Sequence, residues 1–245
     1  MIIENEKRGP FVLKLHSRLS TIVLTFMLAL AAGCSAGAGE RAEQAVPKPT
    51  MDESLASNKS ERSVVVAGGC FWGIQAVFQH VKGVTSATSG YSGGSAKTAE
   101  YETVSTGETG HAESVKIVYD ASQVTYGQLL QVFFSVAHDP TQLNRQGPDE
   151  GTQYRSSIFY ANDEQKKIAE AYIAQLVKAK AYPEPVVTQV VPLKGFYPAE
   201  AYHQNYATLH PDAPYIRYND APKVEHLQEE FPNLYKNNPT LLAIK

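Results

Sequence analysis

One cysteine lies where a strand is expected to lead into a helix, a position that favours thiol chemistry. Cys70 follows the β-branched run Val64–Ala67 and two glycines, and an apolar face with helical spacing begins directly after it. Free amide N–H groups and the dipole at a helix N-terminus favour an anion, so we expect this position to lower the pKa of the thiol. The glycines let the backbone turn sharply before Cys70. A buried, inert cysteine is the alternative, because free cysteines are often buried.

A carboxyl group at the end of an apolar strand face is the second candidate. The segment from His111 to Tyr119 alternates, which places Glu113 on the same face as Val115 and Ile117. Burial there would raise the pKa of the carboxyl group and keep it protonated near neutral pH. Exposure at the strand end, or a salt bridge, is the alternative. A protonated acid and an activated thiol in one domain form a plausible reaction pair.

The composition limits the other kinds of site. The chain of 245 residues has a net charge of −3 and two cysteines, Cys34 and Cys70. Two cysteines exclude a disulfide framework and a four-cysteine zinc site, and a mild acidic excess gives no reason to expect nucleic-acid binding. Gly68 and Gly73 have the spacing of a phosphate-binding loop, but Ile74 stands where that loop needs lysine. The histidines show no metal-ligand spacing, so no metal site is expected.

The elements that would position these groups alternate as in a single mixed α/β domain. The apolar patterns predict strands at 64–67, 111–119, 155–160 and 185–191, and helices at 71–81, 126–137 and 162–180. Asn162, with Gln165 three residues later, is the expected N-cap of the last of these helices. Irregular structure is expected in a glycine-rich loop at 90–94 and in an ordered, aromatic-rich coil at 196–218.

Six short motifs identify the family that the chain resembles. In order along the chain they are GCFWG at 69–73, GYSGG at 90–94, GHAE at 110–113, HDPTQ at 138–142, GTQYRS at 151–156 and YHQ at 202–204. The series resembles peptide methionine sulfoxide reductase A over about residues 62–218, and more weakly in the tail. The resemblance implies an α/β (α+β) fold, a two-layer mixed-sheet sandwich with a ferredoxin-like core and a long ordered coil in a single catalytic domain. It also implies thiol-dependent reduction of S-methionine sulfoxide, protein-bound or free, which repairs oxidised proteins.

The resemblance assigns catalytic roles to four residues. Cys70 would attack the sulfoxide sulfur, and Glu113 would give a proton to the sulfoxide oxygen. Tyr91 and Tyr154 would donate hydrogen bonds to that oxygen. The products would be methionine and the sulfenic acid of Cys70, the first step of cysteine oxidation.

Four further residues would bind the substrate. Phe71 and Trp72 would enclose the S-methyl group, Asp139 would hold the substrate backbone or a hydrogen-bond network of the pocket, and His203 would line the site. The resemblance implies neither a metal ion nor an organic cofactor. The partners it implies are oxidised proteins or peptides and a thiol reductant.

The chain departs from the common family pattern in one respect. Many members carry one or two resolving cysteines near the C-terminus, whereas no cysteine follows Cys70 here. The sulfenic acid would then be reduced by an external thiol, either a thioredoxin-like or glutaredoxin-like protein or a small thiol. A free Cys34 is the internal alternative.

Two rival functions stay open on the residues alone. Cys70 with His203 or His138 as a base could form a hydrolase or an acyltransferase. A non-catalytic lipoprotein that binds peptides in an aromatic groove is the second rival.

The N-terminal residues are expected to target the chain to the cell envelope. Residues 1–33 combine a basic start with an uncharged apolar run, as in a signal peptide, and LAAGC before Cys34 resembles a bacterial lipoprotein cleavage box. Leu30 lies four rather than three positions before Cys34, so cleavage after an Ala-x-Ala site is the alternative. We expect Cys34 to be acylated, which would anchor a monomeric enzyme to a membrane on its periplasmic side.

The remaining boundaries follow from composition. Residues 34–61 lack aromatic side chains and any apolar period, and are expected to form a flexible tether. The catalytic domain is expected at 62–218. Residues 219–245 are expected to form a C-terminal extension with a short helix, an irregular tail and no resolving cysteine.

Overall fold

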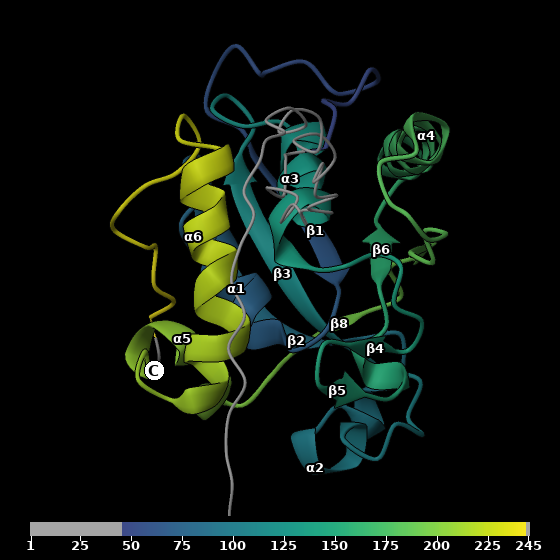
Figure 1. Ribbon diagram of the computed structural model, residues 1–245, viewed down its shortest axis with the longest axis vertical. Coiled ribbons are helices and arrows are strands. Elements are labelled where there is room, and N and C mark those ends of the chain that lie inside the picture. Colours follow the sequence, from purple (N-terminus) through teal and green to yellow (C-terminus); the bar gives the residue numbers. More distant parts are fainter. Residues whose placement is uncertain (1–45, 244–245) are drawn as a thin grey trace, which may run out of the picture. The chain divides into compact units, whose positions relative to one another are not determined.

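A six-stranded sheet forms the centre of the computed structural model, which describes residues 46–243 (Figure 1). The strand order is β7-β6-β1-β3-β2-β8, and all neighbours are antiparallel except β6 and β7. The strands of this sheet are β1 (Glu61–Ala67), β2 (Val84–Ser92), β3 (Ala112–Asp120), β6 (Ser157–Tyr160), β7 (Gln189–Pro192) and β8 (Phe196–Pro198). A separate hairpin pairs β4 (Arg145–Gln146) with β5 (Asp149–Glu150).

Helices connect the strands and follow the last of them. The α-helices are α1 (Phe71–Gln79), α2 (Tyr101–Val104), α3 (Tyr126–Val132), α4 (Asp163–Ala179), α5 (Tyr206–Leu209) and α6 (Ala221–Glu230). Short 3-10 turns form at η1 (Ala96–Thr98), η3 (Thr152–Tyr154) and η4 (Ala201–His203). Two π-helical turns, η2 (Phe133–Ala137) and η5 (Ile216–Asp220), continue α3 and precede α6.

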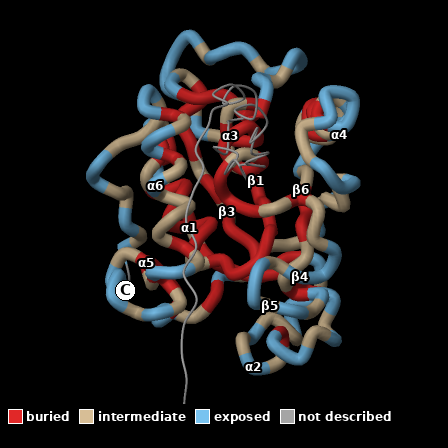
Figure 2. The backbone as a smooth tube through the Cα atoms, in the orientation of Figure 1, coloured by how far each residue is buried: buried red, intermediate tan, exposed pale blue. Residues whose placement is uncertain are grey.

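The chain order β1-α1-β2-β3-α3-β6 and the sheet order β6-β1-β3-β2 define a ferredoxin-like core. One large apolar cluster contains Ile74 of α1, Leu129 of α3 and Ile117 of β3, so both helices pack on the same face of the sheet. Figure 2 shows this buried layer along α1, α3, β1 and β3. The predicted two-layer mixed sandwich is therefore confirmed.

The β-branched run in β1 is buried on both faces of the sheet. Val64 and Val66 join the large cluster under the helices, while Val65 and Ala67 join a smaller cluster with Phe159 on the other face. A continuous rather than alternating apolar pattern is typical of a strand covered on both sides. This burial fixes the end of β1, from which the chain turns into Cys70.

Most of the predicted elements form near their predicted bounds. Asn162 caps α4 by accepting a hydrogen bond from the backbone N–H of Gln165 at 2.9 Å, as predicted. The loop predicted at 90–94 is wrong for residues 90–92, because β2 continues through Gly90 and Tyr91 to Ser92, and irregular structure begins at Gly93. The strand is rich in small polar residues, so its sequence lacks a clear apolar alternation. A side chain at Gly90 would collide with the carbonyl oxygen of Tyr197 in β8, so this glycine permits the close pairing of the two strands.

The C-terminal segment is part of the same compact unit. Helix α6 packs along α1 (Figure 1), and Val81 forms a bridge with Tyr235 beyond α6. The backbone N–H of Lys82 also donates to the carbonyl oxygen of Leu234. The described part of the predicted extension at 219–245 therefore contributes to the core that positions α1.

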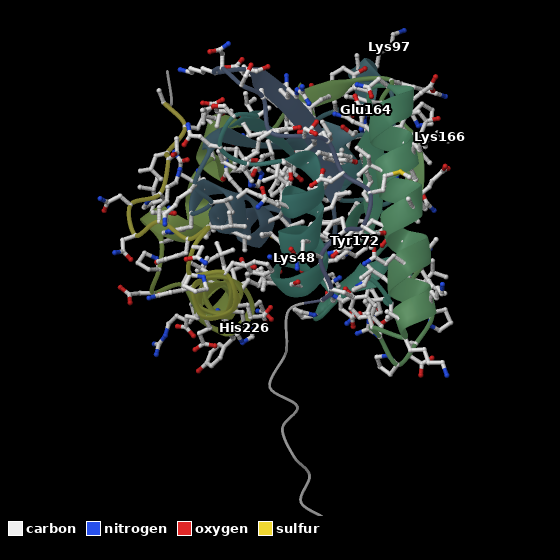
Figure 3. All side chains as sticks on the ribbon, turned by 90° about the horizontal axis from the view of Figure 1, so that it is seen from above. Lys48, Lys97, Glu164, Lys166, Tyr172 and His226 are labelled. Atoms are coloured by element: carbon white, nitrogen blue, oxygen red, sulfur yellow. The ribbon has the colours of Figure 1, made fainter. Side chains whose placement is uncertain are left out.

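Residues 46–60 form an N-terminal strap that is hydrogen-bonded to the helical layer. The side chains of Gln131 and Tyr172 donate to the carbonyl oxygens of Val46 and Pro47, both at 2.8 Å. Figure 3 shows Lys48 beside Tyr172. The predicted flexible tether is therefore wrong for residues 46–60, which pack against α3 and α4.

Two carboxylates of the strap bind the start of α3. Asp52 accepts a hydrogen bond from the backbone N–H of Gly127 at 2.7 Å, and Glu53 accepts one from that of Tyr126 at 3.0 Å. Glu53 also pairs with Arg62 and accepts from the hydroxyl of Tyr119. Anions at a helix N-terminus are stabilising because its first amides have no partner within the helix. Composition alone does not show such capping, since its partners lie far away in the sequence.

The predicted signal peptide, Cys34 and the first part of the predicted tether lie outside the described residues. Within residues 46–243, no helix is both long and apolar enough to cross a bilayer.

Candidate active site

Cys70 is the N-cap residue of α1 and lies at a sharp turn after β1, as predicted. Gly69 adopts a φ of 95°, in the region that favours glycine. A Cβ atom at Gly68 would lie 2.7 Å from the ring of His138, and one at Gly69 would lie 2.5 Å from the side chain of Gln146. Both glycines are therefore needed to bring the turn against the loop that follows η2. The cysteine itself is 8% exposed.

The predicted lowering of the thiol pKa is wrong. Burial raises the pKa of Cys70 well above its ordinary value, and the carboxyl groups of Glu113 and Asp220 act in the same direction. The backbone N–H of Trp72 and the cation of Lys223 oppose this shift without reversing it. At neutral pH the free site therefore holds a thiol rather than a thiolate. The proton of Cys70 has to leave during the reaction, so a neighbouring group must take part in its transfer.

Glu113 lies beside the first turn of α1. One of its carboxyl oxygens accepts a hydrogen bond from the backbone N–H of Phe71, the residue after Cys70, at 3.0 Å. Its side chain is buried, as predicted, and burial raises its pKa to about 8, with Asp149 and Asp220 adding to the effect. Glu113 is therefore protonated at neutral pH and can donate its proton.

Tyr91 lies directly opposite Glu113, across the pairing of β2 with β3. It is wholly buried and belongs to β2, whereas a glycine-rich loop was predicted here. Its hydroxyl donates to Glu200 at 2.9 Å, and Glu200 also accepts from the backbone N–H of Tyr101 at 2.9 Å. Burial raises the pKa of Tyr91, and its bond to Glu200 acts in the same direction. Glu200 was not predicted from the sequence.

An aromatic cluster lies around Trp72. The indole ring stacks on Tyr206 at a centroid distance of 4.0 Å and meets Tyr215 edge-on at 5.9 Å. Its N–H donates to Nδ1 of His203 at 3.2 Å, and the ring of His203 lies 5.0 Å from that of Phe71. Three of the four predicted substrate-binding residues are thus brought together, although Phe71 is buried beneath the cluster.

His203 is a neutral group in this cluster. Burial lowers the pKa of its imidazole, and the nearby carboxylate of Glu200 opposes the shift only in part. The Nε2 atom is buried and has no hydrogen-bond partner within residues 46–243. It can therefore donate a hydrogen bond to a bound molecule.

Tyr154 is the last residue of η3 and interacts electrostatically with both Glu113 and Cys70. Burial raises its pKa, and Glu113, Asp149 and Cys70 act in the same direction, so its hydroxyl keeps its proton. Asp149, just before η3, accepts a hydrogen bond from the hydroxyl of Tyr215. Asp149 was not predicted from the sequence, although it lies two residues before the GTQYRS motif.

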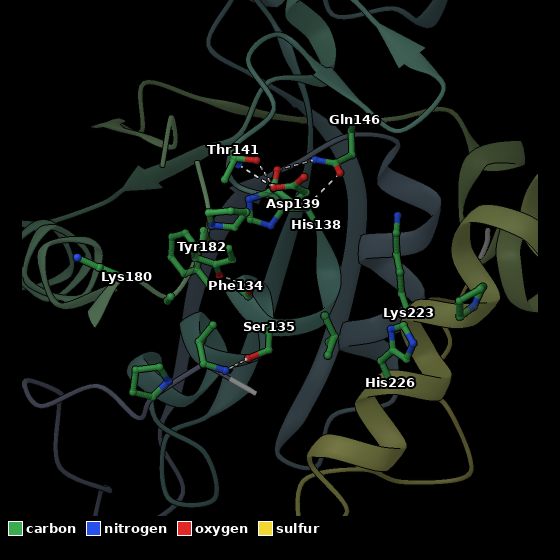
Figure 4. A pocket seen from close by; sticks show the side chains of 16 residues that line it. Phe134, Ser135, His138, Asp139, Thr141, Gln146, Lys180, Tyr182, Lys223 and His226 are labelled. Atoms are coloured by element: carbon green, nitrogen blue, oxygen red, sulfur yellow. Dashed lines mark hydrogen bonds between the residues drawn. The ribbon is translucent and has the colours of Figure 1, made fainter. Parts of the chain in front are cut away.

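Asp139 lines a cavity of about 710 Å³ together with His138 and Gln146, the two residues that lie against the glycines before Cys70 (Figure 4). Its carboxylate accepts hydrogen bonds from the backbone and hydroxyl of Thr141 and from the side chain of Gln142. Burial raises its pKa, but these bonds outweigh the effect and lower the pKa overall. Asp139 therefore belongs to a hydrogen-bond network in its own loop that lines this cavity, which is the second of the two roles predicted for it. Gln146 fixes the same loop by bonding the backbone N–H and carbonyl oxygen of Asp139.

Neither candidate histidine base forms a hydrogen bond with Cys70 in the described part of the chain. Nε2 of His138 is bonded to Ser156, and burial lowers the pKa of His138 to about 4. Nδ1 of His203 is occupied by Trp72. The geometry therefore lacks the thiol–imidazole pair that the rival hydrolase would need.

A buried thiol beside a protonated carboxyl group, with an aromatic cluster next to it, defines a cysteine-dependent enzyme. Within residues 46–243 no cluster of His, Cys, Asp and Glu could hold a metal ion. Residues 62–235 match the family "Peptide methionine sulfoxide reductase". The chain belongs to the peptide methionine sulfoxide reductase family.

Relatives and solved structures agree with this assignment. The chain is 63% identical over 192 residues to "Peptide methionine sulfoxide reductase MsrA 2" of Mesorhizobium japonicum, covering 78% of this chain and 97% of the relative. It is 46% identical over 176 residues to an MsrA of Thermus thermophilus, covering 72% and 98%. Its fold is similar to methionine sulfoxide reductase A of Corynebacterium diphtheriae (TM-score 0.54, 33% identity, 71% and 87% covered).

A second structural match is reduced Mxr1 of Saccharomyces cerevisiae (TM-score 0.56, 30% identity, 67% and 92% covered). The protein is thus a peptide-methionine (S)-S-oxide reductase that reduces methionine sulfoxide in protein repair. The hydrolase and the non-catalytic binder are not favoured.

Proposed function

We propose that Cys70 is the nucleophile and Glu113 the proton donor of methionine sulfoxide reduction. The observation that carries this proposal is the hydrogen bond from the N–H of Phe71 to Glu113, because it fixes a protonated acid one residue from the thiol. General acid catalysis requires a group that is protonated at working pH and within reach of the reacting atom. Glu113 meets the first condition because its pKa is about 8.

The proposed step balances without an added reductant. The sulfur of Cys70 attacks the sulfoxide sulfur while Glu113 protonates the sulfoxide oxygen. This attack forms an S–S bond between the two sulfur atoms. As the oxygen passes to Cys70 as a hydroxyl group, this S–S bond and the S–O bond to the methionine sulfur both break, and an S–O bond forms on Cys70. Glu113 regains a proton from the thiol, so that methionine and the sulfenic acid of Cys70 remain. The sulfoxide sulfur is reduced by two electrons, and the cysteine sulfur is oxidised by two.

Donors around the thiol support a role in holding the sulfoxide oxygen. Tyr154 keeps its hydroxyl proton, and the Nε2 atom of His203, which lies 3.9 Å from the carboxylate of Glu200, has no hydrogen-bond partner among the described residues. The hydroxyl of Tyr91 donates a hydrogen bond to Glu200 in this structure. Tyr91 can donate to the substrate only if this bond breaks. The ring of Trp72, held between Tyr206 and Tyr215, supplies an apolar surface for the S-methyl group.

The sulfenic acid then requires an external thiol. Cys70 is the only cysteine in residues 46–243, and Cys34 is the only other one in the sequence. A first thiolate attacks Cys70, forms a mixed disulfide and releases water; a second thiolate attacks that disulfide and frees Cys70. The proposed reductant is a thioredoxin-like or glutaredoxin-like protein or a small thiol. Methionine sulfoxide in oxidised proteins or peptides is the proposed substrate.

The proposed function predicts a single turnover in the absence of any reductant. Full-length protein mixed with excess peptide containing S-methionine sulfoxide should form about one methionine per chain and then stop, because Cys70 is consumed. Adding a dithiol should restart the reaction. Peptide containing the R epimer is the matched control and should give no product. Absence of methionine from the S epimer would refute the proposal.

We propose further that the chain is anchored to a membrane of the bacterial envelope, on its periplasmic side, through an acylated Cys34. Its support is the basic and apolar N-terminal sequence followed by LAAGC. Partitioning of the wild-type protein into a detergent phase should be lost in Cys34→Ala, because the acyl group is the anchor. Reductase activity of Cys34→Ala in detergent should be unchanged. Equal partitioning of the two proteins would contradict acylation.

A further inference from the structure

A second buried carboxyl group lies beside the first turn of α1, and it comes from the C-terminal part of the chain. Asp220 ends the π-helical turn η5 and directly precedes α6. Its side chain is fully buried, and a Cβ atom at Gly73 would collide with its Oδ1. Gly73 is the third residue of α1, so Asp220 lies against the same turn that begins at Cys70.

Among residues 46–243, the one cation paired with Asp220 is Lys223. Nζ of Lys223 lies 3.1 Å from Oδ1, and this lysine side chain is 17% exposed toward the cavity of Figure 4. The other oxygen, Oδ2, is buried and accepts no hydrogen bond within residues 46–243. A buried carboxyl group with an unpartnered oxygen is costly, and this one lies against the helical turn that begins at Cys70.

Two carboxyl groups therefore flank one helical turn. Glu113 binds the N–H of the first residue of α1, and Asp220 packs against the third. The ionisable groups that interact electrostatically with Cys70 come from five helices, strands or turns. They are Tyr101 of α2, Glu113 of β3, Tyr154 of η3, Tyr215 and Asp220 at η5, and Lys223 of α6.

We propose that Asp220 is a positioning residue whose buried negative charge keeps the protons on Cys70 and Glu113 until substrate binds, and that Lys223 limits this effect. The inference rests on the proposed function, because it assigns the two protons to the step described there. It gives the C-terminal segment a role in the reaction beyond packing on α1.

The signs of the interactions agree with this role. Burial is the main cause of the raised pKa at both Cys70 and Glu113, and Asp220 raises each of them further. Lys223 lowers the pKa of Cys70. Burial also raises the pKa of Asp220 itself, and the interaction with Lys223 opposes this shift only in part. Asp220 and Lys223 thus act on the thiol in opposite directions.

Two variants of the full-length protein test the proposal without substrate. The rate of iodoacetamide alkylation at Cys70, measured by peptide mass spectrometry over a range of pH, reports ionisation of the thiol. Asp220→Asn should lower the midpoint of this profile by about half a pH unit or more, and Lys223→Gln should raise it by a similar amount. A purely structural role would not shift the midpoints in opposite directions.

Asp120→Asn is the matched control. Asp120 lies at the other end of β3 and caps its own turn through Ser122 and Gln123, so its loss should leave the midpoint unchanged.

In Asp220→Asn, the loss of methionine formation at alkaline pH should also begin at a lower pH. Unchanged midpoints, or shifts of the same sign, would overturn the inference. If Asp220→Asn does not fold, the alkylation midpoint of Lys223→Gln alone decides the test: a higher midpoint supports the inference, and an unchanged or lower one overturns it. Failure of the wild type to form methionine would instead refute the proposed function, since alkylation requires no substrate.

Discussion

Cys70→Ser should lower the rate of methionine formation by about 10⁴-fold or more, which is the scale of loss when an enzyme nucleophile is removed. A serine hydroxyl is a far weaker nucleophile than a thiol, and it cannot form the sulfenic acid. The fold should be retained, because serine is a preferred N-cap residue and the side chain of Cys70 makes no capping hydrogen bond to α1. The measurement is single-turnover methionine formation together with a thermal melt.

Cys34→Ser is the matched control for this variant. It should form one methionine per chain at the wild-type rate, because Cys34 takes no part in the first step. Its turnover with added thiol should also match the wild type if an external reductant resolves Cys70. A Cys70→Ser variant that still forms methionine would remove the thiol from the mechanism.

Glu113→Gln should lower the single-turnover rate by about 10²- to 10⁴-fold, the range that general acid catalysis contributes. The amide keeps the size of the side chain, and it can still accept from the N–H of Phe71 and donate to the sulfoxide. It cannot transfer a proton. Glu113→Ala should be slower still, since it removes the donor and leaves the N–H of Phe71 without its partner.

The pH profile separates acid catalysis from a structural role of Glu113. The acid acts in its protonated form, which is present below its pKa of about 8 and is lost as the pH rises through that value. The wild-type rate should therefore fall above about pH 8, and this fall should be absent from Glu113→Gln. The same alkaline fall in both proteins would exclude Glu113 as the proton donor.

Stability should change in the opposite sense to activity. The pKa of Glu113 rises from 4.5 to about 8 on folding, so the unfolded state releases a proton that the folded state keeps. This cost is absent below about pH 4.5 and grows to about 3 kcal/mol at pH 7, at about 1.4 kcal/mol per pH unit. Glu113→Gln should therefore gain stability at pH 7 and lose that gain at pH 4. Urea unfolding at the two pH values measures the difference.

The sequence predicts those features of the site that depend on local pattern. The turn at Cys70 follows from the β-branched strand, the glycines and the helical spacing, and the burial of Glu113 follows from strand alternation. The direction in which the pKa of the thiol shifts does not follow from local pattern. It depends on the amount of protein that covers Cys70, and local sequence shows the helix dipole but not that burial.

Long-range contacts account for the other differences. Glu200 binds Tyr91 across a sequence separation of 109 residues, so no motif spacing connects them. The contact of Asp139 is a local exception: its carboxylate turns back onto Thr141, two residues later, and the motif alone does not show this direction. Asp220 lies beyond the predicted domain boundary at 218, and only the packing of the C-terminal segment brings it to α1.

The packing of residues 46–60 on the domain also limits how far the domain could lie from a membrane if Cys34 were acylated. A tether formed by all of residues 34–61 would extend from Cys34 to the start of β1. The domain is instead fixed from Val46 onward, so the connecting segment ends there. Twelve residue steps from position 34 to position 46 span at most about 40 Å. An acylated enzyme would then act only close to the membrane surface. Oxidised proteins farther from the membrane would have to diffuse to it.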